Sequence, residues 1–158
     1  MNPLLNLRVL NSREKKSILN LFQERYCVSP SKDYVFLLNK ENKLFLINKL
    51  DINLNNLRVN YLGLYIGQIK DKNIRLSIEG SQLLKPIKNT LEVTKEQADS
   101  WMRGESIESK ESFQGFVAIK HGQDYLGSGN YKQGKILNYV PKERRIHITP
   151  SQKIFKLG

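Results

Sequence analysis

One segment of the chain shows the spacing of apolar positions that is typical of a helix packed on a core. Residues 12–25 carry such a stripe, and Asn11 or Ser12 can cap the helix that this stripe predicts. The stripe consists of Ile18, Leu19, Leu21 and Phe22. Further along, Thr94 begins a Thr-x-x-Gln capping box, which predicts a second helix that ends at Met102.

Most other apolar positions form short runs between polar turns, and such runs predict strands. In the first half we expect strands at 34–39, 44–48, 58–69 and 74–78, turns at 40–43 and 70–73, a helical turn at 80–84, and a short helix or loop at 50–57. In the second half we expect strands at 90–93, 113–119, 124–131, 134–140 and 145–149. Short strands around one helix predict a small barrel. Lys85-Pro86 interrupts the pattern, so the sequence predicts an α+β domain at 1–86 and a β-rich domain at 87–158.

The charge of the chain indicates which partners it attracts. It has 158 residues, with 26 Lys+Arg against 15 Asp+Glu and a formal net charge of +11. So strong a positive field selects polyanions. Nucleic acid is favoured over an anionic membrane, because the 12–25 segment has the stripe of a core-packing helix and not bulky membrane anchors. A lysine-rich surface that only keeps the protein soluble is the alternative.

Composition excludes several other classes. The longest uncharged apolar runs, 35–38 and 62–66, are far shorter than the roughly 20 residues of a membrane-spanning helix. No secretory signal is visible, and we expect a cytoplasmic protein. The single Cys27 excludes an intramolecular disulfide and a zinc site built on paired cysteines. His121 and His147 are the only histidines, so we expect no metal and no cofactor.

A search for catalytic motifs favours a protein that is not an enzyme. The Gly-Ser-Gly at 127–129 lacks the third glycine of a dinucleotide-binding loop, because Lys132 stands in its place. P-loop, nucleophile-elbow and zinc-protease motifs are absent from the sequence. His121 and Asp124 lie near Ser128 in the sequence, but this proximity implies no oxyanion site.

Basic and aromatic residues gather towards the C-terminus. Residues 120–158 hold eight basic and two acidic residues, whereas residues 92–111 hold three basic and six acidic ones. Arginine can chelate phosphate, and tyrosine can stack on an unpaired base or fill a barrel core. We leave both roles open for the tyrosines. The cluster comprises Lys120, His121, Tyr125, Tyr131, Lys132, Lys135, Tyr139, Lys142, Arg144 and Arg145.

The order of motifs from Leu91 to Arg145 resembles the PUA domain, the RNA-binding module named from pseudouridine synthases and archaeosine transglycosylases. Its opening strand and helix are similar to 91–94 and 96–102, the next loop and strand to 103–107, the central strand to 115–119, and the closing strand to 125–129. The tail at 134–142 is similar to the C-terminal region of Sun/Fmu-type RNA cytosine-5 methyltransferases.

The first half resembles the pre-PUA domain of small two-domain proteins of ribosome biogenesis. The chain lacks the S-adenosylmethionine domain and the catalytic cysteine motif of the methyltransferases. The resemblance therefore implies that this protein shares the RNA-targeting region of those methyltransferases but does not catalyse methyl transfer.

The resemblance implies an accessory protein that binds structured RNA, with ribosomal RNA favoured over tRNA, in ribosome biogenesis or RNA modification. The N-terminal domain would offer a surface to a protein partner. A non-catalytic subunit of a separate modifying enzyme is the alternative, and a small enzyme or a DNA-binding protein is favoured less. The expected RNA-binding residues are Arg103, Gly104, Lys120, His121, Gly127, Ser128, Gly129, Lys132, Lys135, Lys142, Arg144 and Arg145. Among these, Lys120, Gly127 and Gly129 would form the floor of the groove.

Overall fold

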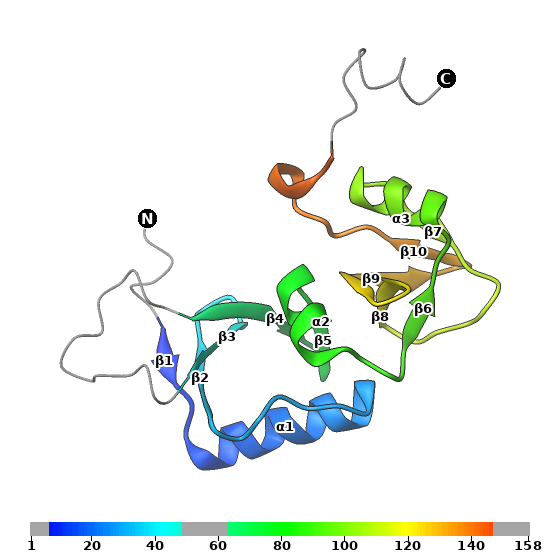
Figure 1. Ribbon diagram of the computed structural model, residues 1–158. Coiled ribbons are helices and arrows are strands. Elements are labelled where there is room, and N and C mark those ends of the chain that lie inside the picture. The colour runs from blue at the N-terminus through cyan, green and yellow to red at the C-terminus, as the bar shows by residue number, and fades with distance from the viewer. Residues whose placement is uncertain (1–6, 49–62, 147–158) are drawn as a thin grey trace.

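The computed structural model describes residues 7–48 and 63–146, which form two five-stranded sheets with helices packed against them (Figure 1). The first sheet is an antiparallel meander in the order β1-β2-β3-β4-β5. Its strands are β1 (Arg8–Val9), β2 (Tyr34–Leu38), β3 (Lys43–Asn48), β4 (Leu64–Lys70) and β5 (Asn73–Leu76). The predicted strands at 34–39 and 44–48 are confirmed, while residues 50–57 and 58–62 lie outside the described ranges.

Helix α1 (Ser12–Tyr26) runs along the first sheet (Figure 1). Asn11 and Glu14 form a capping box at its start, with the Glu14 amide donating to Asn11 Oδ1 at 2.9 Å. The helix buries Phe22 and Tyr26 completely against the sheet. Burial raises the pKa of Tyr26 well above its usual value, so its hydroxyl stays protonated and donates to the Ile74 carbonyl at 2.5 Å. The predicted helix and its cap are confirmed.

The second sheet has the order β6-β8-β9-β10-β7, in which β6 and β8 are parallel and the other neighbours antiparallel. Its strands are β6 (Thr90–Glu92), β7 (Ile107–Glu108), β8 (Phe116–His121), β9 (Asp124–Lys132) and β10 (Lys135–Leu137). Helix α3 (Lys95–Met102) begins at the predicted Thr94 capping box. Trp101 of this helix is fully buried, and its indole nitrogen donates to the Leu126 carbonyl at 2.8 Å.

Some predicted strands are shorter in the structure or are not formed. The strand expected at 134–140, for example, ends at Leu137. The strand expected at 74–78 stops at Leu76, because the Ser77 hydroxyl accepts from the Gly80 amide and starts a helix there. The strand expected at 145–149 is wrong in its described part. A 3-10 turn, η4 (Lys142–Arg144), follows Pro141, and the Ile146 amide then donates to the Met102 carbonyl at 2.8 Å.

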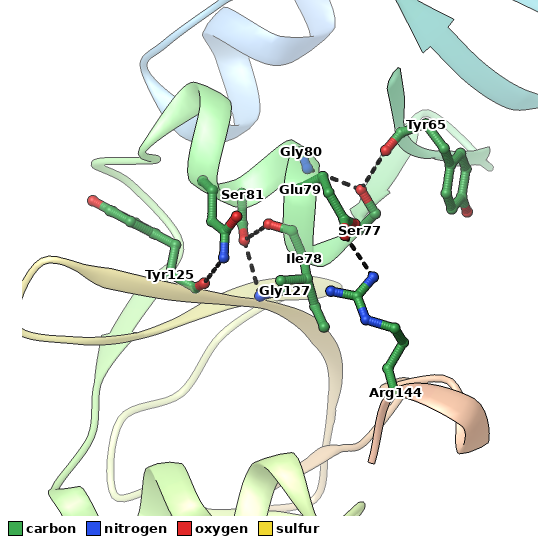
Figure 2. A network of polar contacts seen from close by, with 10 residues as sticks. Tyr65, Ser77, Ile78, Glu79, Gly80, Ser81, Tyr125, Gly127 and Arg144 are labelled. Carbon is green, nitrogen blue, oxygen red and sulfur yellow. Dashed lines mark hydrogen bonds and ion pairs between the residues drawn. The ribbon is translucent and has the colours of Figure 1, made fainter. Parts of the chain in front are cut away.

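Helix α2 (Ile78–Leu84) lies between the two sheets (Figure 1). Each sheet has its own cluster of buried apolar side chains; Ile78 belongs to the second cluster and Leu84 to the first. The buried Ser81 hydroxyl accepts from the Gly127 amide of β9 at 2.9 Å, as Figure 2 shows. Because α2 contributes to both cores, it holds the two sheets together. The domain boundary that the sequence predicts after residue 86 stays a prediction.

Gly80 is the point where α2 lies closest to the first sheet. A Cβ atom built on Gly80 would fall far inside van der Waals contact with the Ile66 carbonyl of β4, which is backbone and cannot turn aside. The close packing of α2 on β4 therefore requires glycine at this position.

Gly80→Ala tests this packing. Helix propensity alone would favour alanine by about 1 kcal/mol. We expect instead that the free energy of unfolding falls by about 1–3 kcal/mol, because the added methyl group must displace backbone. Urea denaturation measures the change. Gly122→Ala is the control, since a Cβ there meets open space and carries only the cost of its left-handed φ of 59°. A Gly80→Ala protein as stable as the wild type would contradict this description of α2.

Candidate nucleic-acid interface

A cleft of about 430 Å³ lies between the two sheets, beside α2. One wall comes from the first sheet and carries Lys43, Tyr65 and Arg75. The opposite wall comes from the segment after β10 and carries Tyr139, Pro141, Glu143 and Arg144. Residues 76–79 and 126–128 form the floor. Segments far apart in the sequence thus meet in a single hollow.

Cations in this cleft lie over aromatic rings. The Arg75 guanidinium is 4.6 Å from the centroid of the Tyr139 ring, and the Lys43 ammonium is 5.9 Å from that of Tyr65. Tyr139 is 39% exposed and contacts Phe116 in an edge-to-face arrangement at 6.2 Å. Positive charge beside flat apolar surface suits both a phosphate and an unpaired base.

The cleft also contains negative charge. Glu79 of α2 pairs with Arg144 of η4 at 2.5 Å between Oε1 and Nη1 (Figure 2). The two side chains are 34% and 46% exposed, so this ion pair is accessible to solvent and to ligands. The sequence predicted Arg144 as a phosphate contact, but no pattern in it predicted the glutamate that the structure places against this arginine.

A second group of predicted residues meets at the end of α3. The Arg145 side chain lies over Gly104, and its Nε donates to the Val140 carbonyl at 3.1 Å. Gly104 has a φ of 97° and no space for a Cβ beneath the guanidinium. Arg103 donates to Ser100 Oγ at 3.0 Å and has its guanidinium 3.7 Å from the Glu105 carboxylate. The structure thus brings Arg103, Gly104 and Arg145 together, next to the exposed Lys142.

Asn138 holds this segment against α3. Its Nδ2 donates to the Trp101 carbonyl at 2.7 Å and to the Glu105 carbonyl at 2.8 Å. Its Oδ1 accepts from the Val140 amide at 2.7 Å. The Asn138 side chain therefore positions the wall of the cleft that carries Tyr139, and also Arg145 beyond it. The sequence offered no signal for this role.

Four other residues that the sequence predicted to bind RNA lie away from the cleft and from the end of α3. Lys120 and His121 are at one end of β8, where Lys120 is 3.8 Å from the Glu92 carboxylate and His121 Nδ1 is 2.8 Å from the Val93 carbonyl. Lys132 and Lys135 are exposed at the opposite end of β9. At about 3.3 Å per residue, the length of β9 separates the two ends by roughly 25 Å. These residues do not join the arginine groups described above.

The floor residues are engaged in packing. Gly127 and Ser128 border the cleft, but the Gly127 amide is bonded to Ser81 and Ser128 Oγ donates to the Leu76 carbonyl at 3.0 Å. Gly129 is buried, and a Cβ there would collide with Trp101 and the backbone of β10. The expectation that Lys120 and Gly129 share the floor of one groove is therefore wrong, because Gly129 makes room for a core tryptophan.

The three tyrosines have different surroundings. Tyr125 is 7% exposed and donates to the Pro86 carbonyl at 3.1 Å, so it belongs to the interior. Tyr131 is half-buried, with its ring 6.0 Å from that of Phe113. Only Tyr139 combines exposure with a place in the cleft. Sequence reasoning missed Lys43, Tyr65 and Arg75. These residues lie opposite Tyr139 only because the two sheets are held side by side in the fold.

Comparison with protein families identifies the second half of the chain. Residues 88–146 match the family model described as the methyltransferase RsmF PUA domain. These residues form a PUA domain. The PUA domain is an RNA-binding module, and here it supplies Arg103, Arg144 and Arg145. A search of curated proteins finds no match to the chain.

The PUA domain forms one wall of the cleft and the first sheet forms the other. In the described ranges, no group of His, Cys, Asp or Glu side chains is arranged to hold a metal ion. Over the same ranges, no helix is both long and apolar enough to cross a membrane.

Asn138→Ala tests the attachment of this wall to the PUA domain. We expect the free energy of unfolding to fall by about 1–3 kcal/mol, because two backbone carbonyls lose their hydrogen-bond partner. Trypsin should also cut faster after Lys142, Arg144 and Arg145. Urea denaturation and timed proteolysis measure the two effects. Asn130→Ala is the matched control, since the half-buried Asn130 side chain makes no hydrogen bond in the described part of the chain. Equal behaviour of the two variants would refute this role.

Proposed function

We propose that this protein binds structured RNA as an accessory factor in ribosome biogenesis or RNA modification. The observation that carries the proposal is the PUA domain at residues 88–146 in a chain of net charge +11. Ribosomal RNA is the favoured ligand, and tRNA is the alternative. RNA duplexes are recognised mainly through shape, phosphates and 2′-hydroxyls, so a surface of grouped arginines suits such a ligand.

Phosphate contact is assigned to the groups on the PUA domain that lie close together. Arg145 and Arg103 flank Gly104, and Lys142 and Arg144 follow on the adjoining turn. Lys132 and Lys135 would act at the far end of β9, as a separate contact or as part of the general positive field. The chain acts in this proposal by binding in the cytoplasm and not by catalysis, in keeping with the absence of catalytic motifs from its sequence.

The N-terminal sheet with α1 is assigned as a pre-PUA domain that offers a surface to a protein partner. A second candidate function follows from the family model, which describes the PUA domain of a methyltransferase. In that case the chain is the RNA-targeting subunit of a separate modifying enzyme. It would then bind RNA weakly alone and tightly in the complex, and affinity capture would return a methyltransferase or a pseudouridine synthase.

The first test is equilibrium binding of the purified protein to ribosomal RNA fragments, bulk tRNA and duplex DNA at several salt concentrations. Selective binding of one structured RNA near physiological salt supports the proposal. Equally weak binding to all three, lost as salt rises, would mean that the charge acts only as a nonspecific field.

Arg144→Ala with Arg145→Ala tests the assigned surface. We expect about tenfold weaker RNA binding and a salt slope reduced by about one to two, because one or two phosphate contacts are lost. Loss of the exposed Arg144–Glu79 pair should cost at most about 1 kcal/mol of stability, and loss of the Arg145–Val140 hydrogen bond about 1–2 kcal/mol more, so the variant should still fold. Arg13→Ala with Lys16→Ala removes the same charge from the exposed side of α1 and serves as the control. If both double variants lose affinity equally, the site assignment fails.

A further inference from the structure

We propose that the cleft between the two sheets accepts one unpaired nucleotide of the bound RNA. This inference rests on the proposed function and adds a defined site to it. The site is shared between the PUA domain and the first sheet, so neither part carries it alone.

The cleft offers planar groups that suit the base of a nucleotide and cations that suit its phosphate. Arg75 and Tyr139 both line the cleft, with the guanidinium 4.6 Å from the centroid of the ring, and bases stack on guanidinium planes as well as on aromatic rings. Among the described residues, Arg75 has no carboxylate partner and bonds only to Gln68 Oε1, at 2.9 Å. The hydroxyls of Tyr65 and Tyr139 likewise have no hydrogen-bond partner within the described ranges, so both can bond to a base or a sugar.

The nucleotide must be unpaired for a geometric reason. A base in a duplex is stacked between its neighbours, and only a bulged, looped or terminal nucleotide can enter a hollow in a protein. The volume of about 430 Å³ lies within the range of small-ligand pockets and is far too small for a helix of RNA. The arginines outside the cleft would hold the adjoining stem by its phosphates.

Glu79 regulates the phosphate end of this site. It pairs with Arg144 at the rim, so a phosphate that approaches Arg144 must compete with a carboxylate. Glu143 also lines the cleft and disfavours anions that bring no further contacts. The site therefore selects a ligand that gains stacking as well as charge, which a nucleotide in a structured RNA does and a free phosphate does not.

The main experiment uses two hairpin RNAs that are identical except for one bulged adenosine. We expect the wild-type protein to bind the bulged hairpin at least fivefold more tightly than the fully paired one. Tyr139→Leu should weaken binding of the bulged hairpin more than binding of the paired one, so that the preference disappears, because the base loses a ring on which to stack. Tyr139→Phe keeps the ring and is the matched control, which should retain the preference.

Three outcomes overturn the site. Wild-type protein that binds both hairpins equally has no nucleotide site, although the proposed function survives. Tyr139→Leu that weakens both hairpins equally shows that Tyr139 supports the structure and not the base. Adenosine monophosphate that displaces the bulged hairpin at micromolar concentration assigns the cleft to free nucleotides. If the wild type binds neither hairpin, nor ribosomal RNA or tRNA, it is the proposed function that fails.

The competition by Glu79 is tested with a double-mutant cycle. Glu79→Gln should tighten binding of the bulged hairpin about threefold, because Arg144 becomes free for phosphate. The gain should disappear in an Arg144→Ala background, where Glu79 has no arginine to hold. A gain of the same size in both backgrounds would show that Glu79 acts only through general charge, and this part of the proposal would be wrong.

Discussion

The packing of one short helix between two sheets determines much of this structure. Helix α2 contributes Ile78 to one core and Leu84 to the other, and its buried Ser81 hydroxyl is bonded to the backbone of β9. The Ser81 hydroxyl also donates to the Ile78 carbonyl, so the group that depends on this bond is the buried Gly127 amide. A buried amide without a partner would cost about 1–3 kcal/mol, and the bond therefore fixes the distance between the helix and the strand. Gly80 lets the other side of the helix approach β4. The cleft, its floor and the position of Glu79 all follow from this arrangement.

Electrostatics in the cleft are more balanced than the net charge suggests. Arg144 is paired with Glu79, and Lys43 is 3.2 Å from the Glu41 carboxylate. Arg75 interacts with the face of Tyr139 and with a neutral amide. A chain of charge +11 attracts any polyanion at long range. At short range, a ligand must displace these carboxylates from their cations. Selective binding therefore depends on further contacts whose free energy exceeds the cost of that displacement.

The C-terminal segment has a structural role as well as a chemical one. Asn138 attaches it to the carbonyls at the end of α3, and Arg145 covers Gly104 in the same region. Arg103 and Arg145, two of the residues proposed to contact phosphate, are therefore held in place by hydrogen bonds within the PUA domain. Such preorganisation reduces the side-chain ordering that binding would otherwise require.

Local signals in the sequence determined much of the secondary structure. Asn11 and Thr94 are capping residues whose bonds form within one helical turn, so both helix starts follow from the sequence alone. The hairpin β2–β3 follows from two apolar runs on either side of a polar turn. The order of motifs after Leu91 predicted the PUA domain, and the family match at 88–146 confirms it.

Only the tertiary structure decided how the candidate site is assembled. The cleft is lined by Tyr139 and by Lys43, Tyr65 and Arg75, which precede it by more than sixty residues in the sequence. No local sequence pattern predicts that residues so far apart line the same cleft. Gly129 fits an RNA-binding motif in sequence but is needed for the packing of Trp101. Sequence spacing also grouped Lys120 with Lys132, although a strand holds them at opposite ends. Capping and strand formation depend on near neighbours, whereas a cleft depends on which faces of distant elements pack together.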